Sequence, residues 1–364
     1  MSTKIVIDAR ESGTGTGRYI DKLIEYLHKL KPDFEIVVLT KSGRIEFMKA
    51  AAPSFEVVES NYKEFTFAEQ IGFLRQLNGL KADLVHFGMT QQPILYRGKA
   101  VTTIHDLTTA RFTNPIKNWL VFKFKQQMYK LVIRRVAKKS VMLLTSSEYV
   151  KRDVAQFARL PANKIVVVYE AADKITAPVE PIVSLSGKQF IMYFGRAQPH
   201  QNLRLAVDAF AELKKDYPRL HLVLVGKLDD SYRLLQKYVR DRGVEQVVFT
   251  DFVSEGELRW LYENARAYVF PSLSEGFGLP GLEALAHGLP LVSSQASCLP
   301  EIYGDAALYF DPKDTDDIAQ KVKAVLQNPQ IAEKLRTVGP KQAAKYSWQR
   351  TAKQTLEVYS KVLG

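Results

Sequence analysis

Two glutamates, Glu275 and Glu283, stand at the ends of the sequence EGFGLPGLE, in which glycine and proline are concentrated. Pro280 suits the first turn of a helix, because the N–H that proline lacks would be unpaired there anyway. The Gly-Leu-Pro sequence at 288–290 ends such a helix, so we expect it over about 280–287. A helix N-terminus carries partial positive charge and favours a bound anion. The pattern predicts an anion site flanked by two carboxylates; the alternative is that both glutamates only cap the helix.

A second candidate binding segment is the glycine-rich sequence DARESGTGTGRYIDKL at residues 8–23. Gly13, Gly15 and Gly17 lie between an expected strand and an expected helix, where backbone N–H groups can approach a phosphate. The spacing GxGxG differs from the GxGxxG of dinucleotide-binding loops, and Lys41 occupies the place of the acid that would bind a ribose. The GxxxxGK[ST] pattern of P-loop enzymes is absent. An NAD-dependent enzyme and a P-loop NTPase are therefore disfavoured.

The elements that must position these residues follow from the hydrophobic pattern. Apolar runs of strand length alternate with amphipathic stretches of helix length, which is typical of parallel α/β sheets. Strands are expected at residues 4–9, 35–40, 55–60, 83–87, 100–106, 140–147, 164–170, 190–195, 221–226, 246–251, 267–272, 289–294 and 307–311. Helices are expected at residues 19–30, 118–139, 148–157, 203–216 and 231–242.

The alternation is interrupted at residues 174–188, where two prolines and small residues indicate a linker. A chain of 364 residues exceeds the size that one hydrophobic core usually organises, so two domains are expected. We predict two Rossmann-like units in tandem, at residues 1–175 and 176–345. Ligands of such sheets bind beyond the carboxyl ends of the strands, so a cleft between the units is the expected site.

Composition and charge narrow the class of protein. The N-terminal sequence MSTKIVIDAR lacks the pattern of an export signal, and no apolar run approaches the roughly 18 to 20 residues that span a bilayer. Cys298 is the single cysteine, which excludes an intrachain disulfide and a cysteine-rich zinc site. These features predict a cytoplasmic protein. The net charge is +12, and residues 1–175 hold 28 Lys and Arg against 17 Asp and Glu, which indicates an anionic partner for that half.

The segment at residues 114–140 contains eight Lys or Arg and no acid, interleaved with Trp119, Leu120, Phe122 and Phe124. Basic amphipathic helices of this composition can lie on anionic bilayers. The alternative is a core helix with a solvated basic face. No motif of a nucleic-acid-binding fold accompanies the segment, so nucleic acid is not an expected partner. Our hypothesis is that it attaches the protein peripherally to the inner face of the plasma membrane.

Five sequences, in order, resemble the retaining nucleotide-sugar glycosyltransferases of family 4, which have the GT-B fold. EGFGLPGLE is similar to the Glu-x7-Glu signature of that family. The others are IDARESGTGTGRY at 7–19, VTTIHDLT at 101–108, YFGRAQPHQNLRLAVDAF at 193–210 and SWQRTAKQTLEVYSKVL at 347–363. The resemblance implies an α/β GT-B fold, with two Rossmann-like domains facing each other across a central cleft. It also implies that the closing helix, at about 346–364, packs back on the first domain.

The resemblance implies that the second domain binds the nucleotide sugar. Glu283 is then expected to accept hydrogen bonds from the ribose hydroxyls. Glu275 is expected beside the transferred sugar, where it bonds a hydroxyl or stabilises positive charge at the anomeric carbon. The loop between them is expected to turn its backbone N–H groups toward the sugar and the diphosphate. The residues of this loop are Gly276, Phe277, Gly278 and Leu279.

Arg196 follows an expected strand, and the resemblance gives it the role of clamping the diphosphate in bidentate fashion. The family usually has a lysine five residues later, where this chain has Gln201. That departure removes one full charge from the donor site. It implies either compensation by His200, another basic group or backbone donors, or weak activity. A nonenzymatic or weakly active sugar-nucleotide-binding protein is therefore one alternative function.

In the first domain, the resemblance gives His105 the role of hydrogen-bonding the donor sugar, whereas a lone histidine is otherwise more often structural. Asp106 is expected to orient its loop or to contact the acceptor. Arg18 is expected to meet the acceptor or a phosphate, and Gly15 and Gly17 are expected to approach the donor.

The expected reaction moves a hexose from a nucleotide sugar, with GDP-mannose favoured, to a glycan or lipid-linked acceptor in polysaccharide biosynthesis. Retention in this family is thought to need no protein nucleophile, because the departing diphosphate helps to deprotonate the acceptor. The protein then supplies positioning and electrostatic stabilisation, and we expect neither a metal ion nor another cofactor. A GT-B-fold epimerase or phosphorylase is the alternative class of enzyme.

Overall fold

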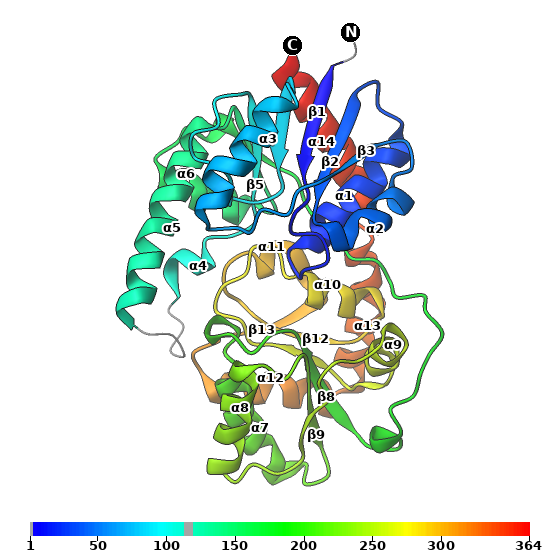
Figure 1. The fold of residues 1–364 in the computed structure, drawn as a ribbon. Coiled ribbons are helices and arrows are strands. Elements are labelled where there is room, and N and C mark those ends of the chain that lie inside the picture. The colour runs from blue at the N-terminus through cyan, green and yellow to red at the C-terminus, as the bar shows by residue number, and fades with distance from the viewer. Residues whose placement is uncertain (1–2, 113–118) are drawn as a thin grey trace. The chain divides into compact units, whose positions relative to one another are not determined.

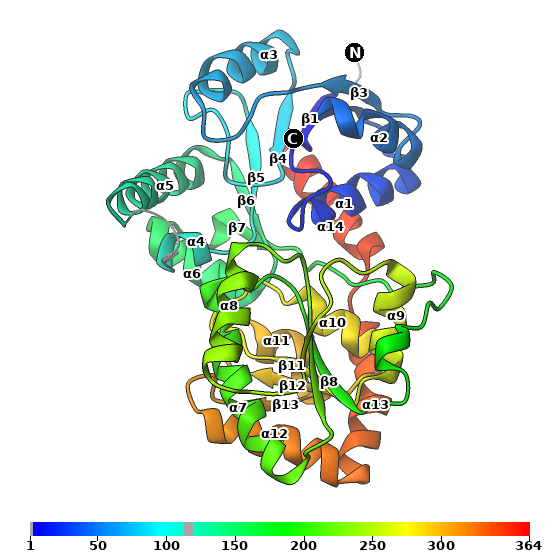
Figure 2. The same ribbon diagram turned by 60° about the horizontal axis from the view of Figure 1, so that its bottom comes forward.

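The computed structural model describes residues 3–112 and 119–364. The chain separates into two compact units, each built around one parallel sheet (Figures 1 and 2). Unit 1 comprises Met1–Ala110, Phe124–Glu170 and Ser347–Gly364, and unit 2 comprises Arg111–Lys123 and Ala171–Tyr346.

The sheet of unit 1 has seven strands in the order β3-β2-β1-β4-β5-β6-β7. The strands are β1 (Lys4–Asp8), β2 (Glu35–Thr40), β3 (Glu56–Glu59), β4 (Leu84–Phe87), β5 (Ala100–Ile104), β6 (Met142–Thr145) and β7 (Ile165–Val167). The order changes direction between β1 and β4, so a crevice is expected beyond the carboxyl ends of these two strands. Central strands covered on both faces must be apolar, and Val6, Val37 and Val85 are fully buried.

The following helices belong wholly or in part to unit 1. They are α1 (Gly17–Leu30), α2 (Ile45–Ala51), α3 (Leu74–Gly79), α4 (Thr108–Arg111), α5 (Trp119–Lys139), α6 (Glu148–Ala158) and α14 (Trp348–Leu363), of which α4 and α5 continue into residues of unit 2. The apolar stripe of α1 shows the helical spacing of three and four that produces one buried face. Its buried members are Tyr19, Ile20, Leu23, Ile24 and Leu27.

The closing helix α14 packs within unit 1 through a buried histidine. His86 of β4 is fully buried; its Nδ1 lies 2.6 Å from the Tyr359 hydroxyl, and its Nε2 lies 2.9 Å from Thr103 Oγ1. Burial, assisted by the nearby His105, lowers the pKa of His86 to about 3, so the imidazole is neutral. A neutral imidazole has one donor and one acceptor, which the two hydroxyls satisfy. The sequence alone gave His86 no role, and the structure makes it an anchor of α14.

The sheet of unit 2 has six strands in the order β10-β9-β8-β11-β12-β13. The strands are β8 (Phe190–Phe194), β9 (His221–Val225), β10 (Val247–Phe249), β11 (Tyr268–Phe270), β12 (Leu291–Ser294) and β13 (Ala307–Phe310). The helices are α7 (Leu203–Asp216), α8 (Asp230–Asp241), α9 (Glu255–Asn264), α10 (Leu279–Ala286), α11 (Leu299–Tyr303), α12 (Thr315–Gln327) and α13 (Pro329–Ala343). The order changes direction between β8 and β11.

The observed elements confirm the sequence-based pattern. Every expected strand occurs; β2 matches its expected range, and each of the others is shorter by one or more terminal residues. The expected helix at 203–216 is α7, and α1 begins two residues earlier than expected, at Gly17. The short helices α2 and α3 were not predicted, because each has too few turns to show the helical repeat of apolar residues. Residues 114–118, the start of the basic segment, lie outside the described residues.

No helix in the described ranges, 3–112 and 119–364, is both long enough and apolar enough to cross a membrane.

His86 is expected to make folding depend on pH. In the unfolded chain its imidazole titrates near 6.5, whereas the folded pKa is about 3. The unfolded chain therefore binds more protons between these values, and stability falls as the pH falls from about 6.5 towards 3, by at most about 1.4 kcal/mol per pH unit. His86→Gln retains hydrogen-bonding groups without titrating, so it should reduce this acid-side slope in urea unfolding at pH 7 and pH 5. His105 is present in both proteins, and an unchanged slope would contradict the assignment.

Candidate functional site

Two loops meet where the strand order of unit 2 changes direction. β8 and β11 are neighbours in the sheet, so the loop at 195–202 and the loop at 271–278 leave the same edge side by side. The backbone N–H of Leu273 donates to His200 O at 2.7 Å and joins the two loops. Ligands of doubly wound sheets bind at this position, so the Glu275 segment lies where a donor site is expected.

The helix that follows the second loop starts from a glycine that no other residue could replace without strain. Gly278 has a φ of 89°, in the left-handed region, and precedes α10 as its N-cap. The Tyr303 hydroxyl donates to Gly278 O at 2.6 Å, and a Cβ on Gly278 would lie 2.3 Å from that hydroxyl oxygen. Pro280 stands in the first turn, and α10 ends at Ala286, so the expected helix is confirmed to within a residue at each end.

The two glutamates lie at different depths around α10. Glu275 is half-buried in the loop before the helix. Glu283 is only 2% exposed, and its Oε2 accepts a hydrogen bond from the Tyr262 hydroxyl at 3.1 Å. Because α10 begins at Leu279, Glu283 falls in the second turn of the helix and not in the first. Their assignments to the sugar and to the ribose stay predictions.

Gln201 lies between the two loops and contacts Glu275 directly. Its Nε2 donates to Glu275 Oε1 at 2.9 Å. Its Oε1 accepts hydrogen bonds from the Tyr193 hydroxyl at 2.6 Å and from Ser272 Oγ at 2.9 Å. The residue that replaces the usual lysine is therefore part of a hydrogen-bonded chain that leads to the carboxylate of Glu275.

The backbone of Glu275 is fixed from the other side by the segment before α11. Its N–H donates to Ser297 Oγ at 2.9 Å, and its carbonyl accepts from Cys298 Sγ at 3.3 Å. The next loop residues, from Gly276 to Gly278, are buried, and the Phe277 ring packs edge-on against Tyr346 at 5.4 Å. Both ends of the loop are thus held by hydrogen bonds and packing.

Arg196 supplies a cation beside the same loops. It follows Gly195, and its carbonyl lies 3.0 Å from the Tyr193 hydroxyl, whose one proton is shared with the closer acceptor, Gln201 Oε1. The side chain is exposed, and it has no hydrogen bond or ion pair to any other residue that the structure describes. The guanidinium is available to an anionic ligand, and its role toward a diphosphate stays a prediction.

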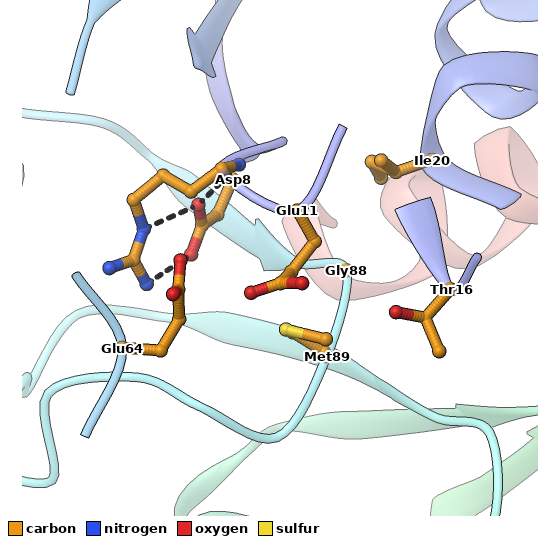
Figure 3. A pocket seen from close by; sticks show the side chains of 8 residues that line it. Asp8, Glu11, Thr16, Ile20, Glu64, Gly88 and Met89 are labelled. Carbon is orange, nitrogen blue, oxygen red and sulfur yellow. Dashed lines mark hydrogen bonds and ion pairs between the residues drawn. The ribbon is translucent and has the colours of Figure 1, made fainter. Parts of the chain in front are cut away.

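The glycine loop of unit 1 borders a small pocket with an acidic lining. The pocket lies beyond the carboxyl ends of β1 and β4, and Figure 3 shows the carboxylates of Glu11 and Glu64 pointing into the same space. Burial, with the neighbouring Glu64, raises the pKa of Glu11 to about 6. A negative lining favours hydroxyl donors over a phosphate. The expected approach of Gly15 and Gly17 to the donor is not tested by this geometry.

A buried arginine supports the floor of this pocket. Arg10 is 2% exposed and pairs with Asp8 Oδ2 at 2.8 Å and with Glu69 Oε1 at 3.0 Å, while its guanidinium lies over the Phe73 ring. Burial opposes the charge, but the two carboxylates hold the pKa of Arg10 above its usual value. Sequence reasoning missed this cluster, although Asp8 and Arg10 at the end of a strand offered a signal for part of it.

His105 follows β5 and is held by two acceptors. Its Nδ1 lies 2.8 Å from Glu170 Oε1, and its Nε2 lies 3.0 Å from Gly88 O. A carboxylate and a carbonyl only accept, so these two contacts together favour an imidazole that carries hydrogen on both ring nitrogens. Burial alone would lower the pKa of His105, but Glu170 raises it above its ordinary value. The structure thus shows a histidine that is oriented by two acceptors, and its contact with a donor sugar stays a prediction.

The other two residues expected at the acceptor lie near the same edge of unit 1. Asp106 Oδ1 accepts from Thr108 N at 2.7 Å and so orders the start of α4, in keeping with a loop-orienting role. Arg18 is half-buried in the first turn of α1.

Comparison with known proteins agrees with the fold. The family model for glycosyl transferases group 1 matches residues 179–342, and the model for Glycosyltransferase Family 4 matches residues 13–174. The O-antigen chain mannosyltransferase B of Escherichia coli is 29% identical over 274 residues, which cover 72% of this chain and 70% of that protein. The serotype-specific mannosyltransferase WbdA of Escherichia coli is 30% identical over 235 residues, which cover 60% of this chain but 28% of that protein.

The fold has counterparts among solved structures. Sucrose-phosphate synthase from Thermosynechococcus elongatus aligns with a TM-score of 0.77 at 16% identity over 99% of both chains. Two parallel-sheet Rossmann-like units and this likeness define the GT-B fold. The chain belongs to the group 1 glycosyltransferases, with a Family 4 domain in its first half.

Gly17 and Gly15 provide a matched pair for testing the glycine loop. A Cβ on Gly17 would lie 1.8 Å from Glu11 O, whereas a Cβ on Gly15 would meet nothing within 4 Å. We expect Gly17→Ala to lower the free energy of unfolding by at least about 1 kcal/mol, because backbone must move. Gly15→Ala should change it by no more than about 0.5 kcal/mol. Equal losses for both variants in urea unfolding would show that the loop does not pack as described.

Proposed function

We propose that this glycosyltransferase is a retaining mannosyltransferase that uses GDP-mannose and extends a glycan or lipid-linked acceptor. The observation that carries the proposal is the placement of Glu275 and Glu283 around the N-terminus of α10, at the switch point of the unit 2 sheet. The choice of mannose rests on the two Escherichia coli relatives, whose names describe mannosyltransferases. An O-antigen-like polysaccharide is the acceptor that the name of the first relative suggests.

The site offers positive charge where a diphosphate would leave. The N-terminus of α10 attracts an anion by roughly 0.3 to 1 kcal/mol when exposed and by more when partly buried. Arg196 adds an exposed guanidinium that can bind two phosphate oxygens together. Stabilising the leaving group in this way lowers the barrier to breaking the bond between the anomeric carbon and the phosphate oxygen.

The carboxylate of Glu275 would act on the sugar. As that bond breaks, positive charge develops at the anomeric carbon, and a fixed carboxylate nearby stabilises it. The acceptor hydroxyl would then bond to this carbon on the face that the diphosphate leaves. Its proton would pass to the departing diphosphate, so the configuration is retained without a protein nucleophile.

We also propose that the reaction needs no metal ion, because Arg196 and the helix N-terminus provide the charge that a divalent cation would supply. The single Asp-x-Asp sequence of the chain, at Asp314 and Asp316, serves another purpose. Asp314 Oδ1 accepts hydrogen bonds from the backbone N–H groups of Asp316 at 2.9 Å and of Asp317 at 3.1 Å, and so caps α12.

The donor assignment is tested by turnover with GDP-mannose and competing nucleotide sugars, followed by NMR of the product linkage. We expect α-mannoside products and unchanged rates in EDTA. Glu275→Gln should lower kcat at least about 100-fold with little change in GDP affinity, because it removes charge only at the sugar. Glu283→Gln should instead weaken GDP binding about tenfold. Inverted products, inhibition by EDTA, or full activity of Glu275→Gln would each count against the mechanism.

Unit 1 presents a surface suited to the membrane attachment predicted from residues 114–140. The solvent face of α5 combines exposed Lys125, Arg135 and Lys138 with Met128 and Leu131, which are 44% and 45% exposed. Apolar side chains so exposed within a basic face match the composition of helices that lie on anionic lipid. We name these five residues the α5 face.

Two neighbouring loops add larger apolar groups beside the α5 face. Phe65 is 66% exposed and its ring lies 6.1 Å from that of Tyr129 on α5. Leu95 is 65% exposed. Pro93, in the same loop, accepts a hydrogen bond from Lys139 of α5 through its carbonyl oxygen. Phe67, which follows Phe65 closely in the chain, is 87% exposed. We propose that these residues enter an anionic bilayer surface while the α5 face contacts the lipid phosphates.

Vesicle binding tests this attachment. The protein should sediment with vesicles of phosphatidylglycerol and phosphatidylcholine at low salt, and not with phosphatidylcholine alone. Arg135→Gln combined with Lys138→Gln should weaken binding at least about tenfold, given about 1 kcal/mol per basic residue near the surface. Phe67→Ser combined with Leu95→Ser should weaken it as well. Phe252→Ser, at a residue of unit 2 that is 84% exposed, is the control. No binding at low salt, or an equal loss in the control, would refute the proposal.

A further inference from the structure

Residue 201 is where this chain departs from the usual lysine, and the structure shows what the replacement contacts. The Glu275 carboxylate can only accept hydrogen bonds, so the amide group that faces it must be the NH2 of Gln201. A flipped amide would set two acceptors against each other at the 2.9 Å separation of these side chains. The orientation of the Gln201 amide is therefore determined by its neighbour.

The opposite end of the amide is also fixed. Its oxygen accepts hydrogen bonds from the hydroxyls of Tyr193 and Ser272, and both of these residues are 2% exposed or less. The backbone turn is held by the next residue, Asn202, whose Nδ2 donates to Pro271 O at 3.2 Å and to Pro312 O at 2.6 Å. Side chain and backbone of Gln201 are thus both constrained before any ligand arrives.

We infer that Gln201 is a positioning residue that orients the Glu275 carboxylate toward the sugar, and that it is not a diphosphate contact. This inference rests on the proposed role of Glu275 at the sugar. An ammonium group at this place would form an ion pair with Glu275 and offset its charge. A neutral amide fixes the carboxylate by a hydrogen bond and places no positive charge beside it. On this inference, the replacement of lysine by Gln201 affects the sugar end of the site and not the diphosphate end.

Gln201→Met tests the inference, because methionine has a similar length and no hydrogen-bonding amide. We expect kcat to fall at least about tenfold, while the KM for the donor and the Kd for the free nucleoside diphosphate change less than about threefold. If Gln201 instead bound the diphosphate, the variant would lose affinity for the nucleoside diphosphate, and kcat/KM would fall by a similar factor. That result would overturn the inference.

A double-mutant cycle with Glu275 tests whether Gln201→Met acts through Glu275 or through a general structural change. If Gln201 acts through Glu275, Gln201→Met should have almost no further effect on kcat in the Glu275→Gln background. Independent, multiplicative losses would contradict the inference. Ser272→Ala removes one anchor of the amide without approaching the ligand, and it should reduce kcat about two- to fivefold with the donor KM unchanged.

Gln198→Met is the matched control, because Gln198 belongs to the same turn and donates to Ser231 on α8, away from Glu275. Wild-type kcat in this variant is expected. The cycle uses whichever nucleotide sugar the wild-type protein turns over, so failure of GDP-mannose as donor would not affect it. If Glu275→Gln itself retains full activity, the proposed role of Glu275 fails, whereas additive losses refute the positioning role of Gln201 alone.

Discussion

The pairing of β8 with β11 is the constraint on which the candidate site of unit 2 depends. These strands lie far apart in the sequence, yet they are adjacent in the sheet at the point where its order changes direction. Parallel neighbours end at the same edge, so the loops that follow them must share a small volume. Gln201 and Glu275, one from each loop, are brought into hydrogen-bonding distance only by that adjacency.

The two units have the same architecture, but they carry different charged groups at their switch points. At the switch point of unit 2, the structure brings together a helix N-terminus and an exposed guanidinium, which suit an anion. At the switch point of unit 1, carboxylates line the pocket, and the buried cation of Arg10 is already paired with Asp8 and Glu69. The basic charge of the first half is found elsewhere, including the solvent face of α5. Overall charge therefore does not describe the ligand preference of the pocket.

The fold was largely predictable because its signals are local. Alternating apolar runs gave the strands of both sheets, and the proline and glycine around α10 gave its ends. The function of single residues was less predictable. His86 and His105 both stand at strand ends, yet His86 lies between two hydroxyls, whereas His105 lies between a carboxylate and a carbonyl. Only their neighbours from other elements distinguish them, because a histidine takes its charge from its surroundings.

The sequence by itself determined the two-unit α/β architecture, the glycine-led helix and its two glutamates, because hydrophobic period and backbone geometry are properties of neighbouring residues. It also showed that residue 201 is not a lysine. The tertiary structure decided what Gln201 contacts. Tyr193, Ser272 and Glu275 reach its amide from different segments, and hydrogen bonds between such segments are set by sheet order and not by sequence spacing.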